Sequence, residues 1–320
     1  MRAAERGKYI MIYGIADMGS NTVRLSIYKC EGGEIRLLMN RKVMAGLAGY
    51  VRHGALTPEG IEVACQTLQG YRSLMDNLEL PDLRVFATAS LRNISNTEEA
   101  VGAVMAATGL RVDVLSGREE AELSFRGAIQ NAGLYTGLLV DLGGGSTELV
   151  SYRNRAIQSA CSLSVGSLSL FSRYVSKLHP TKEERRAICR AVEEQLEQYV
   201  PQHGPARHIC GVGGTVRAAC KVANAMFDRP AGDRSLDRDE LKEMLQRLKK
   251  PGRDELRLLL KTVPDRIHTI IPGLLALDTI AKAYGAQTIT ASACGVREGY
   301  LLARVLGEPL EDQSKITPST

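Results

Sequence analysis

The sequence contains no tryptophan, and aromatic residues make up only 5% of its 320 residues. Proteins that bind single-stranded nucleic acid stack bases on aromatic side chains within basic grooves. The chain also lacks a run of Lys and Arg with interleaved aromatics, and its net charge of +5 is mild. We therefore expect no nucleic-acid partner, although this charge suits small or polymeric anions.

Long apolar runs and paired cysteine motifs are missing as well. No apolar run approaches the roughly 18 residues that cross a bilayer, and the N-terminal residues lack a signal-peptide pattern. The seven cysteines are odd in number, scattered and never spaced C-x-x-C. This pattern argues against a zinc site and against a disulfide framework, and it favours a reducing compartment. We expect a cytoplasmic protein with no membrane partner.

Two common nucleotide-binding signatures are absent, namely G-x-x-x-x-G-K-[ST] and G-x-G-x-x-G. Glycine is instead concentrated in three short segments. Two of them, DMGSNTVRL at 17–25 and DLGGGSTEL at 141–149, align without a gap, and the third is GVGGT at 211–215. A repeated feature of this kind predicts two related domains, each opening with a strand, a loop and a return strand.

The chain length supports a division into two domains, because one domain usually takes roughly 100–200 residues. We predict an N-terminal domain at 1–131 and a C-terminal domain at 132–320, both α/β. The apolar patterns predict strands at 10–16, 23–28, 35–44, 83–90, 110–117, 138–141, 147–153, 156–163, 208–211 and 287–290. They predict helices at 57–78, 97–107, 118–133, 165–176, 181–200, 215–226, 236–248, 274–284 and 296–306.

The glycine-rich loops are candidates for phosphate binding. Successive backbone N–H groups in a tight loop form a concavity for anions, and Gly lets the backbone approach a ligand closely. A helix that begins with Gly and Thr offers a further anion site at its N-terminus. The predicted phosphate-binding residues are therefore Gly19, Ser20, Asn21, Thr22, Gly143, Gly144, Gly145, Ser146, Thr147, Gly213, Gly214 and Thr215.

Acidic residues flank the second loop. Asp141 ends one predicted strand and Glu148 begins the return strand, so a hairpin brings their side chains together. Bare carboxylates repel phosphate, whereas Mg²⁺ accepts one or two carboxylates together with phosphate oxygens and water. The sequence therefore predicts a Mg²⁺ site at Asp141 and Glu148, with Asp17 of the first copy nearby.

Six segments carry a resemblance to a known family. They are ADMGSNTVRL, ATASLRN, LSGREEAEL, VDLGGGSTELV, GVGGTVRA and ASACGVREGY, in this order. Together they resemble the exopolyphosphatase / guanosine pentaphosphate phosphatase (Ppx/GppA) family of the actin/Hsp70/sugar-kinase superfamily, in its short two-domain form. The resemblance implies two ribonuclease-H-like domains, each with a central mixed sheet and flanking helices, and an active site in the cleft between them. It also suggests that the last helix, 296–306, packs back toward the first domain.

The resemblance also implies roles for single residues. Glu120 of the LSGREEAEL segment would be the general base that activates water, whereas Glu119 suits the acidic first turn of a helix. Arg24, Arg92 and Arg266 would contact phosphate. The implied cofactor is Mg²⁺, with Mn²⁺ as an alternative and a monovalent cation in addition. The implied substrate is inorganic polyphosphate or guanosine pentaphosphate.

Two other function classes stay open at this stage. One is an ATP-dependent kinase or ATPase built on the same superfamily fold, with 211–215 as its adenosine site. The other is a non-catalytic protein that binds polyphosphate or an alarmone. The oligomeric state is also open, with a homodimer as one alternative.

Overall fold

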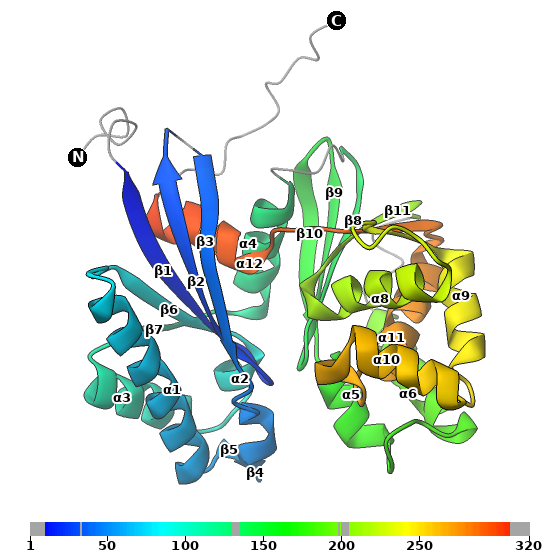
Figure 1. Cartoon of the computed structure of the whole chain (residues 1–320), viewed down its shortest axis with the longest axis horizontal. Coiled ribbons are helices and arrows are strands. Elements are labelled where there is room, and N and C mark those ends of the chain that lie inside the picture. Colours follow the sequence, from blue (N-terminus) through cyan, green and yellow to red (C-terminus); the bar gives the residue numbers. More distant parts are fainter. Residues whose placement is uncertain (1–9, 33, 130–134, 198, 200–204, 308–320) are drawn as a thin grey trace, which may run out of the picture. The chain divides into compact units, whose positions relative to one another are not determined.

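The computed structural model describes residues 10–32, 34–129, 135–197, 199 and 205–307. The chain divides into two compact units, residues 1–116 and 117–320. Each unit is a mixed β-sheet with helices packed against it (Figure 1). The predicted α/β class and the two mixed sheets with flanking helices are confirmed. No described helix is long and apolar enough to cross a membrane, and all seven cysteines are free.

The first unit contains a five-stranded sheet in the order β3-β2-β1-β6-β7. The three strands β1, β2 and β3 form an antiparallel meander, and β6 and β7 continue the sheet in parallel with β1. The strands are β1 (Met11–Met18), β2 (Val23–Glu31), β3 (Glu34–Val43), β6 (Leu83–Ala87) and β7 (Val112–Val114). A short ribbon of β4 (Val51–Arg52) and β5 (Ala55–Leu56) and the 3-10 helix η2 (Leu47–Tyr50) follow β3.

The two longer helices of this unit begin and end within one residue of the predicted bounds, whereas Ala89 and Ser90, predicted as the end of a strand, begin a short helix. Helix α1 (Pro58–Asn77) has Thr57 as its N-cap, whose side chain accepts a hydrogen bond from the backbone of Gly60. Helix α3 (Thr97–Thr108) ends at Gly109, which adopts the left-handed conformation. Both helices contribute to the buried core, for example through Leu68 and Val104, and the short helix α2 (Ala89–Arg92) follows β6.

The second unit contains a six-stranded sheet in the order β10-β9-β8-β11-β13-β12. Its strands are β8 (Gly137–Leu142), β9 (Thr147–Arg153), β10 (Ala156–Leu163), β11 (His208–Val212), β12 (Ser235–Asp237) and β13 (Thr288–Ala291). The helices are α4 (Gly117–Ile129), α5 (Ser167–Tyr174), α6 (Lys182–Leu196), α8 (Gly213–Met226), α9 (Arg238–Arg247), α10 (Arg253–Thr262), α11 (Ile270–Tyr284) and α12 (Val296–Tyr300). A π-helical turn, η4 (Leu301–Val305), extends α12, and the 3-10 turn η3 (Pro264–Arg266) precedes α11.

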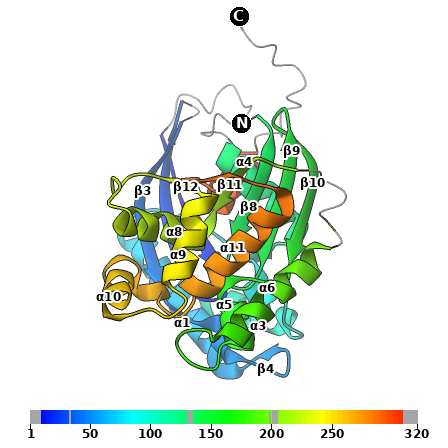
Figure 2. The ribbon, with the colours of Figure 1, turned by 90° about the vertical axis from the view of Figure 1, so that its right-hand side faces the viewer.

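The helices of the second unit cover its sheet in two groups. One group consists of α5, α6, α8, α9 and α11 (Figure 2). These helices enclose the larger core with side chains such as Leu170, Ile188 and Val216. A smaller core joins α4 to the sheet through Phe125 and Tyr152, whose ring centroids are 5.1 Å apart. The capping box of α6, in which Thr181 and Glu184 exchange hydrogen bonds, fixes the start of this helix where the sequence predicts it.

The two sheets share one topology, as the repeated glycine segments predict. Strand β1 pairs antiparallel with β2 and parallel with β6. In the same way, β8 pairs antiparallel with β9 and parallel with β11. Strands β1, β2, β3, β6 and β7 of the first unit therefore correspond to β8, β9, β10, β11 and β13 of the second. Strand β12 is an addition that pairs antiparallel with β13 at the sheet edge.

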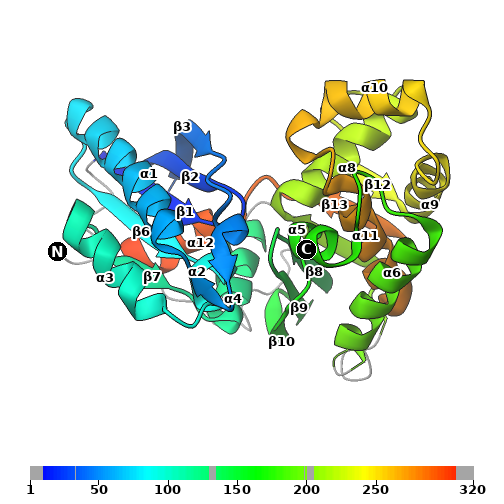
Figure 3. The ribbon, with the colours of Figure 1, turned by 90° about the horizontal axis from the view of Figure 1, so that it is seen from below.

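The two units divide earlier in the chain than the sequence boundary between 131 and 132, which lies outside the described residues. Helix α4 belongs to the second unit because it packs on β9, β10 and α12. Figure 3 shows α4 beside the strands that follow it. The C-terminal helix α12 contacts α4, a helix that the predicted boundary would have assigned to the first domain.

Two elements of the second unit were missed in the sequence. Helix α10 has only one buried residue, Leu259, although its apolar and charged residues lie on separate sides of the helix. Strand β12 has three residues, of which only Leu236 is buried, and its segment was predicted as the start of a helix. The predicted end of α6 at Val200 lies outside the described residues.

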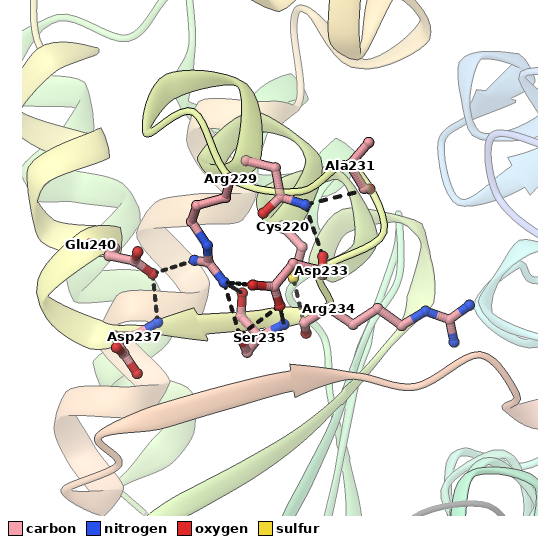
Figure 4. Close-up of polar contacts among 9 residues, drawn as sticks. Cys220, Arg229, Ala231, Asp233, Arg234, Ser235, Asp237 and Glu240 are labelled. Carbon is pink, nitrogen blue, oxygen red and sulfur yellow. Dashed lines mark hydrogen bonds and ion pairs between the residues drawn. The ribbon is translucent and has the colours of Figure 1, made fainter.

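The loop before β12 is held by a polar network rather than by apolar contacts. The guanidinium of Arg229 pairs with Asp233 and with Glu240, and it also donates to the carbonyl oxygen of Ser235 at 3.0 Å (Figure 4). Glu240 in turn accepts a hydrogen bond from the backbone N–H of Asp237, which begins α9. One arginine thus links the loop, strand β12 and helix α9.

Candidate active site

The two glycine-rich hairpins have the same turn. In the first, the N–H of Gly19 donates to the carbonyl oxygen of Thr22 at 3.1 Å, and in the second Gly143 donates to Ser146 at 3.1 Å. The positions aligned in the sequence are therefore equivalent in space. Asp17 stands opposite Arg24 in the first hairpin, and Asp141 stands opposite Glu148 in the second.

The carbonyl groups of both loops accept hydrogen bonds from the segment that follows the third strand. Ala48 donates to the carbonyl of Ser20, and Leu168 donates to that of Gly144, both at 2.9 Å. With these carbonyls engaged on one side, the backbone N–H groups of Gly144 and Gly145 have no partner among the described residues. Unpaired N–H groups in such a turn attract anions. The loop geometry supports the prediction of a phosphate cradle.

Asp141 and Glu148 are both buried, with 8% and 1% of their surface exposed. Each accepts a hydrogen bond from a serine. Ser124 of α4 donates to Oδ2 of Asp141 at 2.5 Å, and Ser162 of β10 donates to Oε1 of Glu148 at 2.7 Å. The serines hold the two carboxylates in fixed orientations at the end of the hairpin.

The charges around this pair are unbalanced. Burial raises the pKa of Glu148 well above its usual value, and the negative charges of Glu120 and Asp141 raise it further. Burial also raises the pKa of Asp141, although the hydrogen bond from Ser124 and the positive charges of Arg217 and Arg297 act in the opposite direction. Three carboxylates therefore share a buried region in which ionised forms are costly without a cation.

This donor set fits a hard divalent cation. Carboxylate oxygens are the ligands that Mg²⁺ prefers, and it normally takes only one or two of them. In the described part of the chain, no three acidic, His or Cys side chains converge as a metal site. A pair of carboxylates such as Asp141 and Glu148 leaves positions on such a cation for water and for phosphate oxygens.

Glu120 lies in the first turn of α4 and is 8% exposed. Helix α4 is fixed at close range to α12, because a Cβ at Gly127 would collide with the backbone carbonyl of Gly295. An ion pair of 2.5 Å between Glu119 and Arg304 joins the same two helices. Glu119 lies in the first turn of α4, as predicted, and its exposed side chain turns to Arg304 of the π-helical turn η4. The backbone contact of Gly127 with Gly295 sets the position of the helix that carries Glu120.

The third glycine segment begins helix α8 beside the carboxylate pair. Gly213 has a φ of +92°, and a Cβ there would lie 2.9 Å from Oδ1 of Asp141. The helix has no side-chain cap, and the guanidinium of Arg266 lies against Gly214. A helix N-terminus next to an arginine suits an anion. The predicted residues Gly213, Gly214 and Arg266 are thus brought together next to Asp141.

Some predicted phosphate ligands use their hydroxyl groups to hold the loop. Thr147 is fully buried and donates to the carbonyl oxygen of Val165 at 2.5 Å. Thr215 is 2% exposed and donates to the hydroxyl of Ser167 at 3.2 Å, and the hydroxyl of Ser146 bonds to Glu148. Because the hydroxyl groups of these residues bond within the protein, we expect backbone N–H groups to contact phosphate.

Sequence reasoning missed the residues that orient the carboxylates. A signal existed for Ser124, which follows Glu120 by four residues and therefore lies on the same face of α4. Ser162 gave no such signal, because it is far from Glu148 in sequence and is aligned with it only by the pairing of β9 with β10.

The candidate residues of the first unit form their own group. Ser20 is buried, Arg24 is on β2 opposite Asp17, and Arg92 in α2 donates to the carbonyl oxygen of Leu115 at 3.1 Å. Helix α2 follows β6 just as α8 follows β11. The expectation that these residues act on one substrate with those of the second unit stays a prediction.

Residues 26–308 match the Ppx/GppA phosphatase family. Among solved structures, the Ppx/GppA family member of Aquifex aeolicus is similar at 25% identity and a TM-score of 0.77, over 94% of this chain and 99% of that one. An exopolyphosphatase from Cytophaga hutchinsonii shares the fold at 22% identity and a TM-score of 0.82, over 93% of this chain and 98% of that one.

Proposed function

Because the chain belongs to the Ppx/GppA phosphatase family, we propose that it is a metal-dependent exopolyphosphatase. Its substrate would be inorganic polyphosphate, from which it removes the terminal phosphate, and guanosine pentaphosphate would be a second substrate. The free cysteines and the absence of a membrane-spanning helix among the described residues suit action in the cytoplasm. No feature of the second unit favours a kinase or a non-catalytic binder over this proposal.

One observation carries the proposal. Glu120, Asp141 and Glu148 are buried together at the end of a hairpin whose loop has unpaired N–H groups at Gly144 and Gly145. A site for a phosphate chain needs backbone donors and a cation, and a hydrolase needs a base in addition. In this proposal the residues of one unit would supply the donors and the base and would hold the cation.

In the proposed mechanism, Asp141 and Glu148 would hold Mg²⁺ or Mn²⁺, which supplies neutralising charge to the phosphate oxygens. The loop amides and Arg266 orient the terminal phosphate. Glu120 accepts a proton from water as the water oxygen forms its bond to phosphorus. The bond from that phosphorus to the bridging oxygen breaks, and the shortened chain leaves with this oxygen.

The test is phosphate release from long-chain polyphosphate in the presence of Mg²⁺. Glu120→Gln should lower kcat by roughly 10²–10⁴-fold, because the carboxamide cannot accept the proton, while substrate binding persists. Glu119→Gln is the matched control, since it makes the same change one residue earlier and should keep activity within a few-fold. The proposal fails if the wild-type protein releases no phosphate, or if Glu120→Gln is as active as the control.

Guanosine pentaphosphate needs a separate assay with the same variants. If it is hydrolysed and the activity falls in Glu120→Gln, both substrates use one site. A protein that binds polyphosphate tightly but hydrolyses neither substrate would instead be a non-catalytic binder.

A further inference from the structure

Arg266 ends the short turn that precedes helix α11 in the second unit. Its backbone N–H donates to the carbonyl oxygen of Val263 at 2.9 Å, and its carbonyl oxygen accepts from the N–H of Thr269 at 3.0 Å. Thr269 is buried and directly precedes α11. The backbone from which the Arg266 side chain extends is therefore held in place on both sides.

Helix α11 in turn lies close to the start of α8. A Cβ at Gly273 of α11 would collide with Cγ2 of Thr215, and it would lie 3.3 Å from Cβ of Ser167. The hydroxyl of Thr215 also donates to the hydroxyl of Ser167 at 3.2 Å. This close packing fixes the beginning of α11 relative to the N-terminus of α8, and with it the backbone of Arg266.

The guanidinium of Arg266 occupies the space in which a side chain at position 214 would begin. An ideal Cβ at Gly214 would lie 2.7 Å from Cζ and 3.4 Å from Nε of Arg266, and it would overlap Nη2. Any other residue at this position would therefore displace the guanidinium. Because the guanidinium is the far end of a flexible side chain, it can turn aside while the backbone stays in place.

The backbone conformation does not explain why residue 214 is a glycine. The preceding residue, Gly213, has a φ of +92°, which favours glycine by itself. Gly214 follows in the first turn of α8, and its φ lies outside the left-handed region. Glycine is among the least favourable residues in a helix. The contact with Arg266 supplies the reason for the missing side chain.

We propose that Gly214 is a positioning residue, which seats the guanidinium of Arg266 at the N-terminus of α8 so that both bind the terminal phosphate. The N-terminal end of a helix carries partial positive charge and does not attract a guanidinium. A phosphate group beside both accepts hydrogen bonds from each of them. This inference rests on the proposed function, because it gives Gly214 a part in binding the same substrate.

The test is a cycle of variants in a Glu120→Gln background, which slows hydrolysis so that binding can be measured. Calorimetric titration with tripolyphosphate in the presence of Mg²⁺ gives the affinity. Gly214→Ala should weaken binding by roughly tenfold, because a hydrogen bond from a charged group contributes about that factor. It should keep or raise the unfolding temperature, because the guanidinium moves aside and alanine favours the helix.

Arg266→Ala separates positioning from a contact that position 214 makes by itself. Without the guanidinium, the methyl group of Gly214→Ala displaces nothing, so adding it to Arg266→Ala should leave the affinity unchanged. A further loss in the double variant would show that position 214 acts on the ligand independently of Arg266, and would overturn the proposal. Unchanged affinity in either single variant would overturn it too, and so would a loss of folding in Gly214→Ala that Arg266→Ala does not relieve.

Gly70→Ala is the matched control. Gly70 is exposed within α1, and a Cβ there would meet nothing within 4 Å, so the affinity should not change. Phosphate release by the wild-type protein is measured in parallel. Binding of tripolyphosphate without release would contradict the proposed hydrolase, whereas the cycle would still decide the role of Gly214. If the Glu120→Gln protein does not bind tripolyphosphate, the inference is wrong.

Discussion

Asp141 and Glu148 stand opposite each other across the β8–β9 hairpin, and a separate serine orients each carboxylate. The serines come from different elements, α4 for Ser124 and β10 for Ser162. The two carboxylates are therefore held in position before any ligand binds. Their positions depend on how α4 and β10 pack against the β8–β9 hairpin.

The first prediction concerns Ser124. Replacement by Ala removes the hydrogen bond to Asp141, so the carboxylate loses its orientation and becomes harder to ionise. Partners of this kind typically contribute a factor of about 10–100 to metal affinity. We expect the Mg²⁺ concentration for half-maximal phosphate release to rise by about this factor. Ser172→Ala, at an exposed position of α5, is the control, and an unchanged Mg²⁺ requirement in Ser124→Ala would contradict the assignment.

A second prediction tests the close packing of α4 on α12. Gly127→Ala places a methyl group against the backbone of Gly295, which cannot move aside as a side chain would. Overpacking of this kind costs about 1–3 kcal/mol, and the shift of α4 should also displace Glu120 and lower kcat. Unfolding in urea gives the stability, and phosphate release gives kcat.

Gly102→Ala is the matched control for that experiment. Gly102 is an exposed residue inside α3, and a Cβ there would meet nothing within 4 Å. The same substitution should therefore stabilise the protein by about 0.5–1 kcal/mol, through the helix preference of Ala. If Gly127→Ala also stabilises the protein, the contact between α4 and α12 has room for the added methyl group and the prediction is wrong.

A third prediction concerns the network around Arg229. Arg229→Gln removes its ion pairs with Asp233 and Glu240, so the loop before β12 should lose its anchor and thermal stability should fall. Arg257→Gln is the control, because Arg257 pairs with Asp254 at 3.9 Å on the exposed side of α10, where ion pairs contribute little. Differential scanning calorimetry measures the unfolding temperatures of both variants. Equal values would show that the Arg229 network contributes no more to stability than an exposed ion pair.

The fourth prediction uses pH. Burial lowers the pKa of His179, whose two ring nitrogens have no hydrogen-bond partner within the described residues. A histidine that is neutral in the fold stabilises it fully above its unfolded pKa of about 6.5. This contribution is lost as the pH falls through the lower folded value, because the unfolded chain then binds the proton first.

His179→Phe should therefore reduce the loss of stability as the pH falls below about 6.5. His53→Asn serves as the control, since His53 is exposed and its positive φ of 51° is readily adopted by Asn. Urea unfolding at several pH values measures the effect. If the free energy of unfolding of His179→Phe depends on pH as in the wild type, protonation of this ring is not coupled to unfolding.

The sequence predicted those features that local chemistry determines. The hairpins follow from an apolar strand, a glycine loop and a return strand, and the helix starts at Thr57 and Thr181 follow from their capping side chains. Asp141 and Glu148 could be paired because a hairpin places its two ends together.

Features that depend on contacts between distant segments could not be predicted. Whether α4 belongs to the first or the second unit depends on its packing against β9, β10 and α12, and no local pattern records this.

The repeated hairpin has one more consequence, which concerns how a duplicated segment diverges. Both copies keep the aspartate and the turn, but the position opposite the aspartate is Arg24 in one and Glu148 in the other. The first copy pairs a carboxylate with a guanidinium, whereas the second pairs two carboxylates, and Arg217 and Arg297 act on Asp141 from outside the loop. A single exchange of sign at one position of a repeated loop thus distinguishes the hairpin that would hold the cation of the proposed mechanism from the hairpin that keeps an arginine.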